Sequence, residues 1–170
     1  MLENKDKTQR MVFTALFGAL SCVATWVIRI PSPLGGYLNL GDGLVLLCGF
    51  CLGGWYGVSA AGIGSMMADF FGGYLHYMPA PLLIQAFMAA TAGVLYQVIR
   101  KGQKSRTLLA ATVSGIVAEL FMLLGYYLFA LIFLREGAAL TIPGNAIQGC
   151  AGIVLGVALL MALQKAGVAD

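Results

Sequence analysis

The chain has 170 residues, of which 60% are hydrophobic and 10% are charged, with a formal net charge of +3 and a mean hydropathy of +0.89. Soluble domains carry about 25% charged residues, and a chain this short buries too little surface to hide so many apolar side chains. These values exclude a soluble globular domain, a nucleic-acid-binding protein and a disordered chain. They predict a single integral membrane domain.

The first apolar segment follows the basic residues Lys5, Lys7 and Arg10, an arrangement that signal peptides share. A signal peptide has an apolar region of about 7–15 residues, followed by a small-residue cleavage site. The apolar run here covers 11–28 and no such site follows it. We therefore interpret 11–28 as the first membrane-spanning helix.

Further apolar segments divide into five more spans, given that a helix of about 20 residues crosses the bilayer core. Gly53 and Gly54 interrupt an apolar run that is too long for one helix, so that run is expected to form two. Pro79 and Pro143 fall near helix starts, where proline is tolerated. The sequence predicts an all-α bundle of six transmembrane helices in one domain, at 11–28, 41–53, 55–70, 79–99, 107–134 and 143–164.

The distribution of charge predicts the orientation of this bundle. Six spans place both termini on one side of the membrane, and the opposite side then carries only Arg29 and Arg135 as basic residues. Cytoplasmic loops carry an excess of lysine and arginine, so both termini are expected in the cytoplasm. The basic residues on that side are Lys5, Lys7, Arg10, Arg100, Lys101, Lys104, Arg106 and Lys165.

Three acidic residues, Asp42, Asp69 and Glu119, fall within the expected spans or at their ends. An ionisable group inside a membrane costs at least a few kcal/mol, so each marks a candidate functional site. Asp42 opens the second span, and we interpret it first as a helix cap. Asp69 shares a helix face with Ser65, and this position suits either a substrate contact or a structural anchor.

Glu119 lies inside the fifth span with no basic residue within helical reach. Met122 and Tyr126 follow it on the same helix face. A carboxyl, a thioether and a phenol on one face can hold a flat polar ring by stacking and hydrogen bonding. Asn145 and Gln148, three residues apart on the sixth span, add amides that donate and accept. A carboxyl satisfied by neighbouring helices remains the alternative for Glu119.

The expected external loops and the fourth span hold the other polar candidates. We expect the loop residues to form a lid over a pocket that opens to the outside, with Gln85 of the fourth span as a further amide. His76 is the only histidine in the chain, which excludes a multi-histidine metal site. The loop candidates are Tyr37, Asn39, Tyr74, His76 and Tyr77.

Two other functional classes compete with a binding protein. Cys48 and Cys51 form a C-x-x-C pair, which can act as a thiol–disulfide centre. This pair lies in the cytoplasmic half of its span without a partner pair outside, where disulfide chemistry is expected. A small channel is the other alternative, although the acids form no evident ring. The chain lacks a phosphate loop, an HExxH motif and a nucleophile elbow, so we expect no enzyme activity.

Several motifs resemble the S components of energy-coupling factor (ECF) vitamin transporters. They are Ala15 and Ala19 in the first span, IPSP at 30–33, GYLNLGD at 36–42, and GIGSMMAD at 62–69 followed by Gly73-Tyr74. The resemblance covers the whole chain in length and number of spans. It implies a membrane-embedded subunit that captures a vitamin or vitamin precursor with high affinity for an ABC-type importer.

The resemblance also implies partners and a site. Ala15 and Ala19 would contact a membrane coupling subunit, and two partner ATPase subunits would use ATP, so no cofactor is expected in this chain. The loop and helix patterns look most like hydroxymethylpyrimidine or pyridoxine members, with riboflavin members as the alternative. The family pocket lies in the outer half of the bundle, which coincides with our candidates: Asn39, Asp69, Tyr74, His76, Tyr77, Gln85, Glu119, Tyr126, Asn145 and Gln148.

Overall fold

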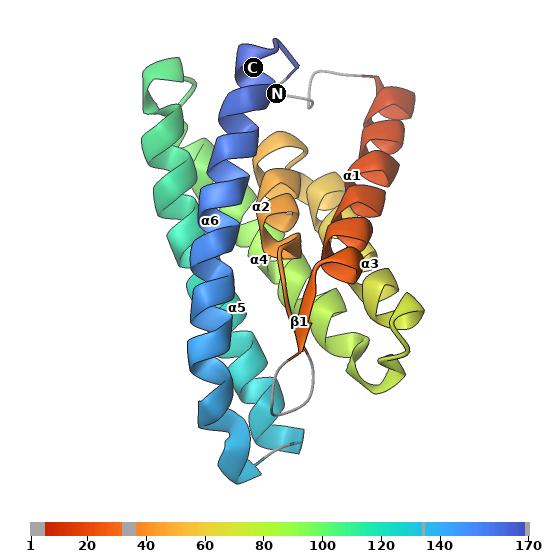
Figure 1. Cartoon of the computed structure of the whole chain (residues 1–170). Coiled ribbons are helices and arrows are strands. Elements are labelled where there is room, and N and C mark those ends of the chain that lie inside the picture. The colour runs from red at the N-terminus through yellow and green to blue at the C-terminus, as the bar shows by residue number, and fades with distance from the viewer. Residues whose placement is uncertain (1–5, 32–36, 134, 169–170) are drawn as a thin grey trace.

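The computed structural model describes residues 6–31, 37–133 and 135–168, and within them the chain forms six α-helices and one small hairpin (Figure 1). The predicted all-α, six-helix fold is confirmed. Short 3₁₀ turns cover Leu75–Tyr77, Lys104–Arg106 and Arg135–Leu140. The helices are α1 (Lys7–Val27), α2 (Gly41–Cys51), α3 (Gly54–Phe71), α4 (Pro79–Arg100), α5 (Thr107–Phe133) and α6 (Thr141–Lys165).

Helix α2 corresponds to the short second span expected at 41–53, and it lies at the centre of the bundle. Its 11 residues cover about 17 Å, roughly half of the hydrocarbon core. It contacts α1, α3, α4 and α6, and all its residues except Leu44 are buried. The helix ends where Gly53 and Gly54 adopt φ of 59° and 44°, values that glycine reaches without a steric penalty. Neighbouring helices, rather than lipid, therefore surround α2.

The outer surface of the bundle is apolar. Among the described helices, α1, α4, α5 and α6 are long and apolar enough to cross a membrane. Large apolar side chains point outward along them, such as Val12 and Leu16 on α1 and Leu120 and Leu124 on α5. An exposed apolar surface of this kind is stable only against lipid tails.

Small residues allow the helices inside the bundle to approach closely. A Cβ on Gly49 of α2 would lie 2.5 Å from the carbonyl oxygen of Ala89 on α4. A Cβ on Gly64 of α3 would meet the carbonyl oxygen of Gly18 on α1. Contacts between backbones are typical of membrane helices, which gain stability from close packing.

The hairpin joins α1 to α2. Strand β1 (Arg29–Pro31) pairs antiparallel with β2 (Tyr37–Asn39), with Arg29 opposite Asn39. The expected lid includes this hairpin, but residues 32–36 and the side chain of Tyr37 lie outside the described part of the chain. Asn39, an expected lid residue that the structure describes, ends β2 just before α2 begins.

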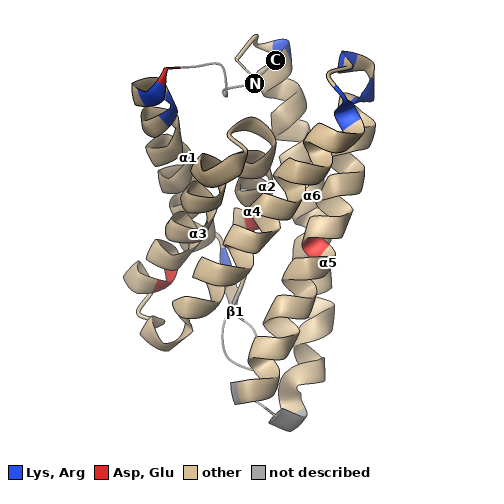
Figure 2. Cartoon of the chain, turned by 180° about the vertical axis from the view of Figure 1, so that it is seen from behind, with Lys and Arg blue, Asp and Glu red and all other residues tan. Residues whose placement is uncertain are grey.

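The basic residues gather at one end of the bundle. Figure 2 shows most of the blue segments at the end where α1 begins, α6 ends and the α4–α5 loop lies, and one further blue segment near β1. The positive-inside rule places that end in the cytoplasm. The hairpin and the Leu75–Tyr77 turn then face the outside.

This orientation predicts the accessibility of two exposed loop positions, Ser105 and His76. In a chain whose native cysteines are replaced by alanine, a membrane-impermeant maleimide added outside intact cells should label His76→Cys and not Ser105→Cys. Permeabilising the cells should expose Ser105→Cys to the reagent. Labelling of Ser105→Cys in intact cells would contradict the orientation.

Candidate functional site

Asp42 lies at the centre of a polar cluster inside the bundle. Its side chain is fully buried in the first turn of α2. Nε2 of Gln85 on α4 donates a hydrogen bond to Oδ1 at 2.8 Å, and Nε2 of Gln148 on α6 donates to Oδ2 at 2.7 Å. A buried carboxylate is strongly unfavourable unless its oxygens are hydrogen-bonded. These two amides therefore tie α4 and α6 to α2.

Gln148 also joins the hairpin to this cluster. Its Oε1 accepts a hydrogen bond from the backbone N–H of Asn39 at 2.9 Å and a longer one from Asn39 Nδ2 at 3.5 Å. Asn39 Oδ1 accepts the N–H of Gly41, the first residue of α2, at 2.7 Å. The side chain of Gln148 therefore bonds at both ends, and it holds the last residue of β2 beside the carboxylate of Asp42.

Glu119 lies beside the same cluster on α5. Its side chain is 6% exposed, and neither carboxyl oxygen has a hydrogen-bond partner among the described residues. A Cβ on Gly152 of α6 would lie 2.6 Å from Glu119 Oε1 and 2.9 Å from Asp42 Cβ, so both acids approach one point of α6. Gln85 Oε1 is also buried without a partner in the described part of the chain. Three oxygens can therefore accept N–H or O–H donors from a bound molecule.

The interpretation of Asp42 as a helix cap is wrong. A cap accepts backbone N–H groups of its own helix, whereas the oxygens of Asp42 accept side-chain amides of α4 and α6. Sequence reasoning placed Gln85 and Gln148 among the candidates but missed the residue that joins them. The sequence did offer a signal: isolated polar side chains in apolar spans must form hydrogen bonds with one another, and Asp42, Gln85 and Gln148 are such residues.

Two further candidates lie on the outer side of this cluster. Tyr126 follows Glu119 along α5 and Asn145 precedes Gln148 along α6, and both side chains are half-buried. The ring of Tyr77 lies 5.7 Å from that of Phe129 on α5, which brings the Leu75–Tyr77 turn against this helix. These residues surround the outer approach to the acids.

Asp69 and Tyr74 lie at the end of α3, next to Arg29. The backbone carbonyl of Asp69 accepts the N–H of Tyr74 at 2.9 Å, and the Asp69 side chain is buried. The guanidinium of Arg29 donates to the carbonyl of Ala68 at 2.5 Å and lies 5.5 Å from the centre of the Tyr74 ring. These contacts tie the end of α3 to Arg29 of β1, and the role of the Asp69 carboxyl stays a prediction. His76, in the adjacent turn, is exposed.

Cys48 and Cys51 lie deep inside the bundle on α2. Both are buried and both are free thiols, and Cys48 Sγ lies 3.7 Å from Ser21 Oγ on α1. Thiol–disulfide exchange needs a thiol that a second molecule can reach. Burial therefore makes this pair a packing element.

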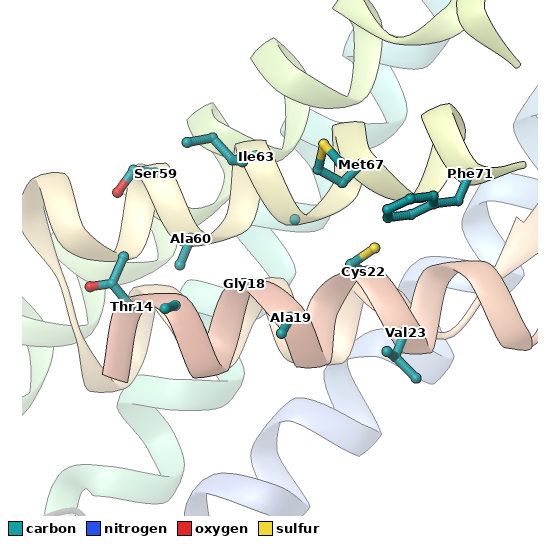
Figure 3. Close-up of a pocket in the computed structure, with 12 residues that line it drawn as sticks. Thr14, Gly18, Ala19, Cys22, Val23, Ser59, Ala60, Ile63, Met67 and Phe71 are labelled. Carbon is teal, nitrogen blue, oxygen red and sulfur yellow. The ribbon is translucent and has the colours of Figure 1, made fainter. Parts of the chain in front are cut away.

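A groove opens on the lipid-facing surface between α1 and α3 (Figure 3). Its volume is about 440 Å³. Ala15 and Ala19 are exposed on its α1 side, while Met67 and Phe71 line its α3 side. The groove is apolar and lies on different helices from Glu119 and Gln148.

Comparisons with known proteins agree on the architecture. The family described as "ECF-type riboflavin transporter, S component" matches residues 5–165. An uncharacterised protein in the gap 3' region of Pyrococcus woesei is 33% identical over 147 residues, covering 84% of this chain and 93% of that protein. A solved structure of the S component of a bacterial ECF transporter has a TM-score of 0.67 at 18% identity, covering 94% of this chain and 98% of the other. The matching family is a riboflavin type, not the hydroxymethylpyrimidine or pyridoxine type that the motifs resemble most.

The contact of both acids with α6 predicts a steric requirement at Gly152. Gly152→Ala should destabilise the protein by about 1–3 kcal/mol, the usual cost of overpacking, because its methyl group would overlap Glu119 Oε1 and Asp42 Cβ. Thermal unfolding in detergent measures the effect.

Gly115→Ala on α5 is the matched control, since the nearest atom to its Cβ would be 3.6 Å away. Its melting temperature should stay close to that of the unmodified chain. Equal melting temperatures for the two variants would contradict the packing described here.

Proposed function

Because the chain belongs to the family of ECF transporter S components, we propose that it captures riboflavin. As an S component it is a multi-pass protein of the cytoplasmic membrane that binds substrate for the transporter and is not an enzyme. The observation that carries the choice of riboflavin is the family match, which extends over residues 5–165.

The chemistry of the polar cluster is compatible with this substrate. Riboflavin carries an N–H between two carbonyls at one edge of its ring and several hydroxyls on its ribityl chain. The carboxyl of Glu119 and Oε1 of Gln85 are buried acceptors without a donor among the described residues. A buried acceptor that is left without a donor costs about 1–3 kcal/mol. A donor on the substrate would therefore be held firmly here.

The surroundings of Glu119 suit a flat aromatic ring. Met122 is buried one turn along α5, and Tyr126 lies one turn further, half-buried on the same face. A thioether and an aromatic ring both pack favourably against a planar ring system. We place the ring of riboflavin between this face of α5 and the start of α6, where Asn145 and Gln148 lie.

Transport would use a separate surface of the protein. We place the membrane coupling subunit in the groove between α1 and α3, against Ala15 and Ala19 (Figure 3). The apolar lining and small side chains would let a partner helix approach closely. Two ATPase subunits would hydrolyse ATP, and this chain itself would need no cofactor.

The first test of the proposal is direct binding. The fluorescence of riboflavin should be quenched when it binds to the purified chain. Glu119→Gln should weaken the affinity of the chain for riboflavin by more than about tenfold. The reason is that the amide of glutamine would replace one acceptor by a donor and leave buried groups unpaired, at a cost of about 1–3 kcal/mol, and about 1.4 kcal/mol corresponds to a factor of ten.

Asp6→Asn, at an exposed position before α1, makes the same chemical change outside the cluster and should leave the affinity unchanged. Hydroxymethylpyrimidine and pyridoxine serve as competitors and should not displace riboflavin. Displacement of riboflavin by either one would count against the assignment, and an unaltered affinity in Glu119→Gln would remove this residue from the site.

The second test separates capture from transport. Ala19→Leu should fill the groove, abolish co-purification with the coupling subunit and stop riboflavin uptake by cells, while the isolated chain keeps its riboflavin affinity. Ala162→Leu makes the same change at an exposed position of α6 and should leave co-purification and uptake intact. Normal uptake by Ala19→Leu would argue against this docking surface.

A further inference from the structure

A compact basic loop joins α4 to α5 at the cytoplasmic end of the bundle. It contains Arg100, Lys101, Lys104 and Arg106, and the sequence has no acidic residue between Asp69 and Glu119. Figure 2 shows the blue segment of this loop projecting beyond the ends of α4 and α5. The segment 70–118 therefore carries four basic residues and no acidic one.

The backbone of the loop is ordered and keeps a cation at a strained position. Lys101 has a φ of 46° and Gly102 a φ of 73°. The N–H of Gln103 donates to the carbonyl of Arg100 at 2.9 Å, and the N–H of Arg106 donates to that of Gln103 at 3.1 Å. Within the described ranges Lys101 is the one non-glycine residue with a positive φ. It stands at a helix end, where glycine is usual. A lysine there favours a role for its charge over a role in the turn.

Arg100 lies at the base of this loop with an unsatisfied donor. Its side chain is 8% exposed, and Nε is buried with no hydrogen-bond partner in the described part of the chain. Its Cζ lies 5.8 Å from the ring centre of Tyr96, which is fully buried and packs on Phe50. The aromatic ring holds the guanidinium in place by a cation–π contact but offers no acceptor to Nε. A buried charged donor without an acceptor is unfavourable, so the guanidinium of Arg100 favours a nearby anion.

We propose that the 100–106 loop, with Arg100 at its base, binds the phosphate of an anionic phospholipid of the cytoplasmic leaflet. Basic residues next to the cytoplasmic ends of membrane helices attract anionic headgroups. A guanidinium presents several N–H donors in a plane that matches phosphate oxygens. The loop directly follows the membrane-spanning part of α4, so lipid headgroups are the phosphates nearest to it. This site is independent of the vitamin that the chain captures.

Native mass spectrometry of the detergent-purified chain tests the proposal. The probes are phosphatidylglycerol, phosphatidylcholine and inorganic phosphate. Phosphatidylglycerol should bind at least about tenfold tighter than phosphatidylcholine, and Arg100→Gln should weaken its affinity by about tenfold. Lys7→Gln also removes one cytoplasmic cation and should change that affinity less than about twofold.

A double variant covers the case in which Arg100→Gln fails to fold. Lys101→Gly with Arg106→Gln relieves the backbone strain and removes two cations from the loop, and it should lose phosphatidylglycerol binding in the same way. Lys5→Gln with Lys7→Gln is its control, and an unchanged melting temperature in detergent reports folding.

Equal losses in loop variants and controls would overturn the site in favour of diffuse attraction. Equal affinities for the two lipids would overturn it as well. Displacement of phosphatidylglycerol by millimolar inorganic phosphate would overturn the lipid assignment and leave a site for soluble phosphates.

Discussion

The buried carboxylate of Asp42 is the constraint on which the arrangement of this bundle depends. A charge inside a membrane protein must be given hydrogen bonds by other helices, and here Gln85 and Gln148 provide them. These two bonds fix α4 and α6 against the short central helix α2. Gly152 then permits α5 to bring Glu119 to the same point. One pair of amides thus determines the positions of the helices that form the site.

The proposed binding role of Glu119 rests on the difference between the two acids. The protein satisfies both oxygens of Asp42, whereas those of Glu119 have no partner among the described residues. A substrate with N–H or O–H groups supplies what Glu119 lacks, and the other acid stays fixed as a support. The groove at Ala15 and Ala19 lies on α1 and α3, helices that supply none of these contacts. The proposed capture site and the proposed docking surface for the coupling subunit therefore lie on separate faces of one small protein.

Hydropathy and charge were sufficient to predict the fold but only part of the site. The six helices could be predicted because apolar runs and glycine or proline boundaries are local features. The role of Asp42 could not, since its partners lie 43 and 106 residues away in the chain and a residue at a helix start looks like a cap. The central position of α2 was also hidden, because its burial depends on contacts with helices far away in the chain. Loose motifs in the first 80 residues identified the transporter family, but S components that bind different vitamins share such motifs.

The most direct test of this account is to identify the molecule that co-purifies with the chain. The protein would be purified from cells in mild detergent and denatured, and the released compound would be analysed by mass spectrometry and by its visible absorption. The account predicts riboflavin in a one-to-one ratio with the chain. A pyrimidine or pyridine vitamin in its place, or an empty protein that fails to bind added riboflavin, would contradict it.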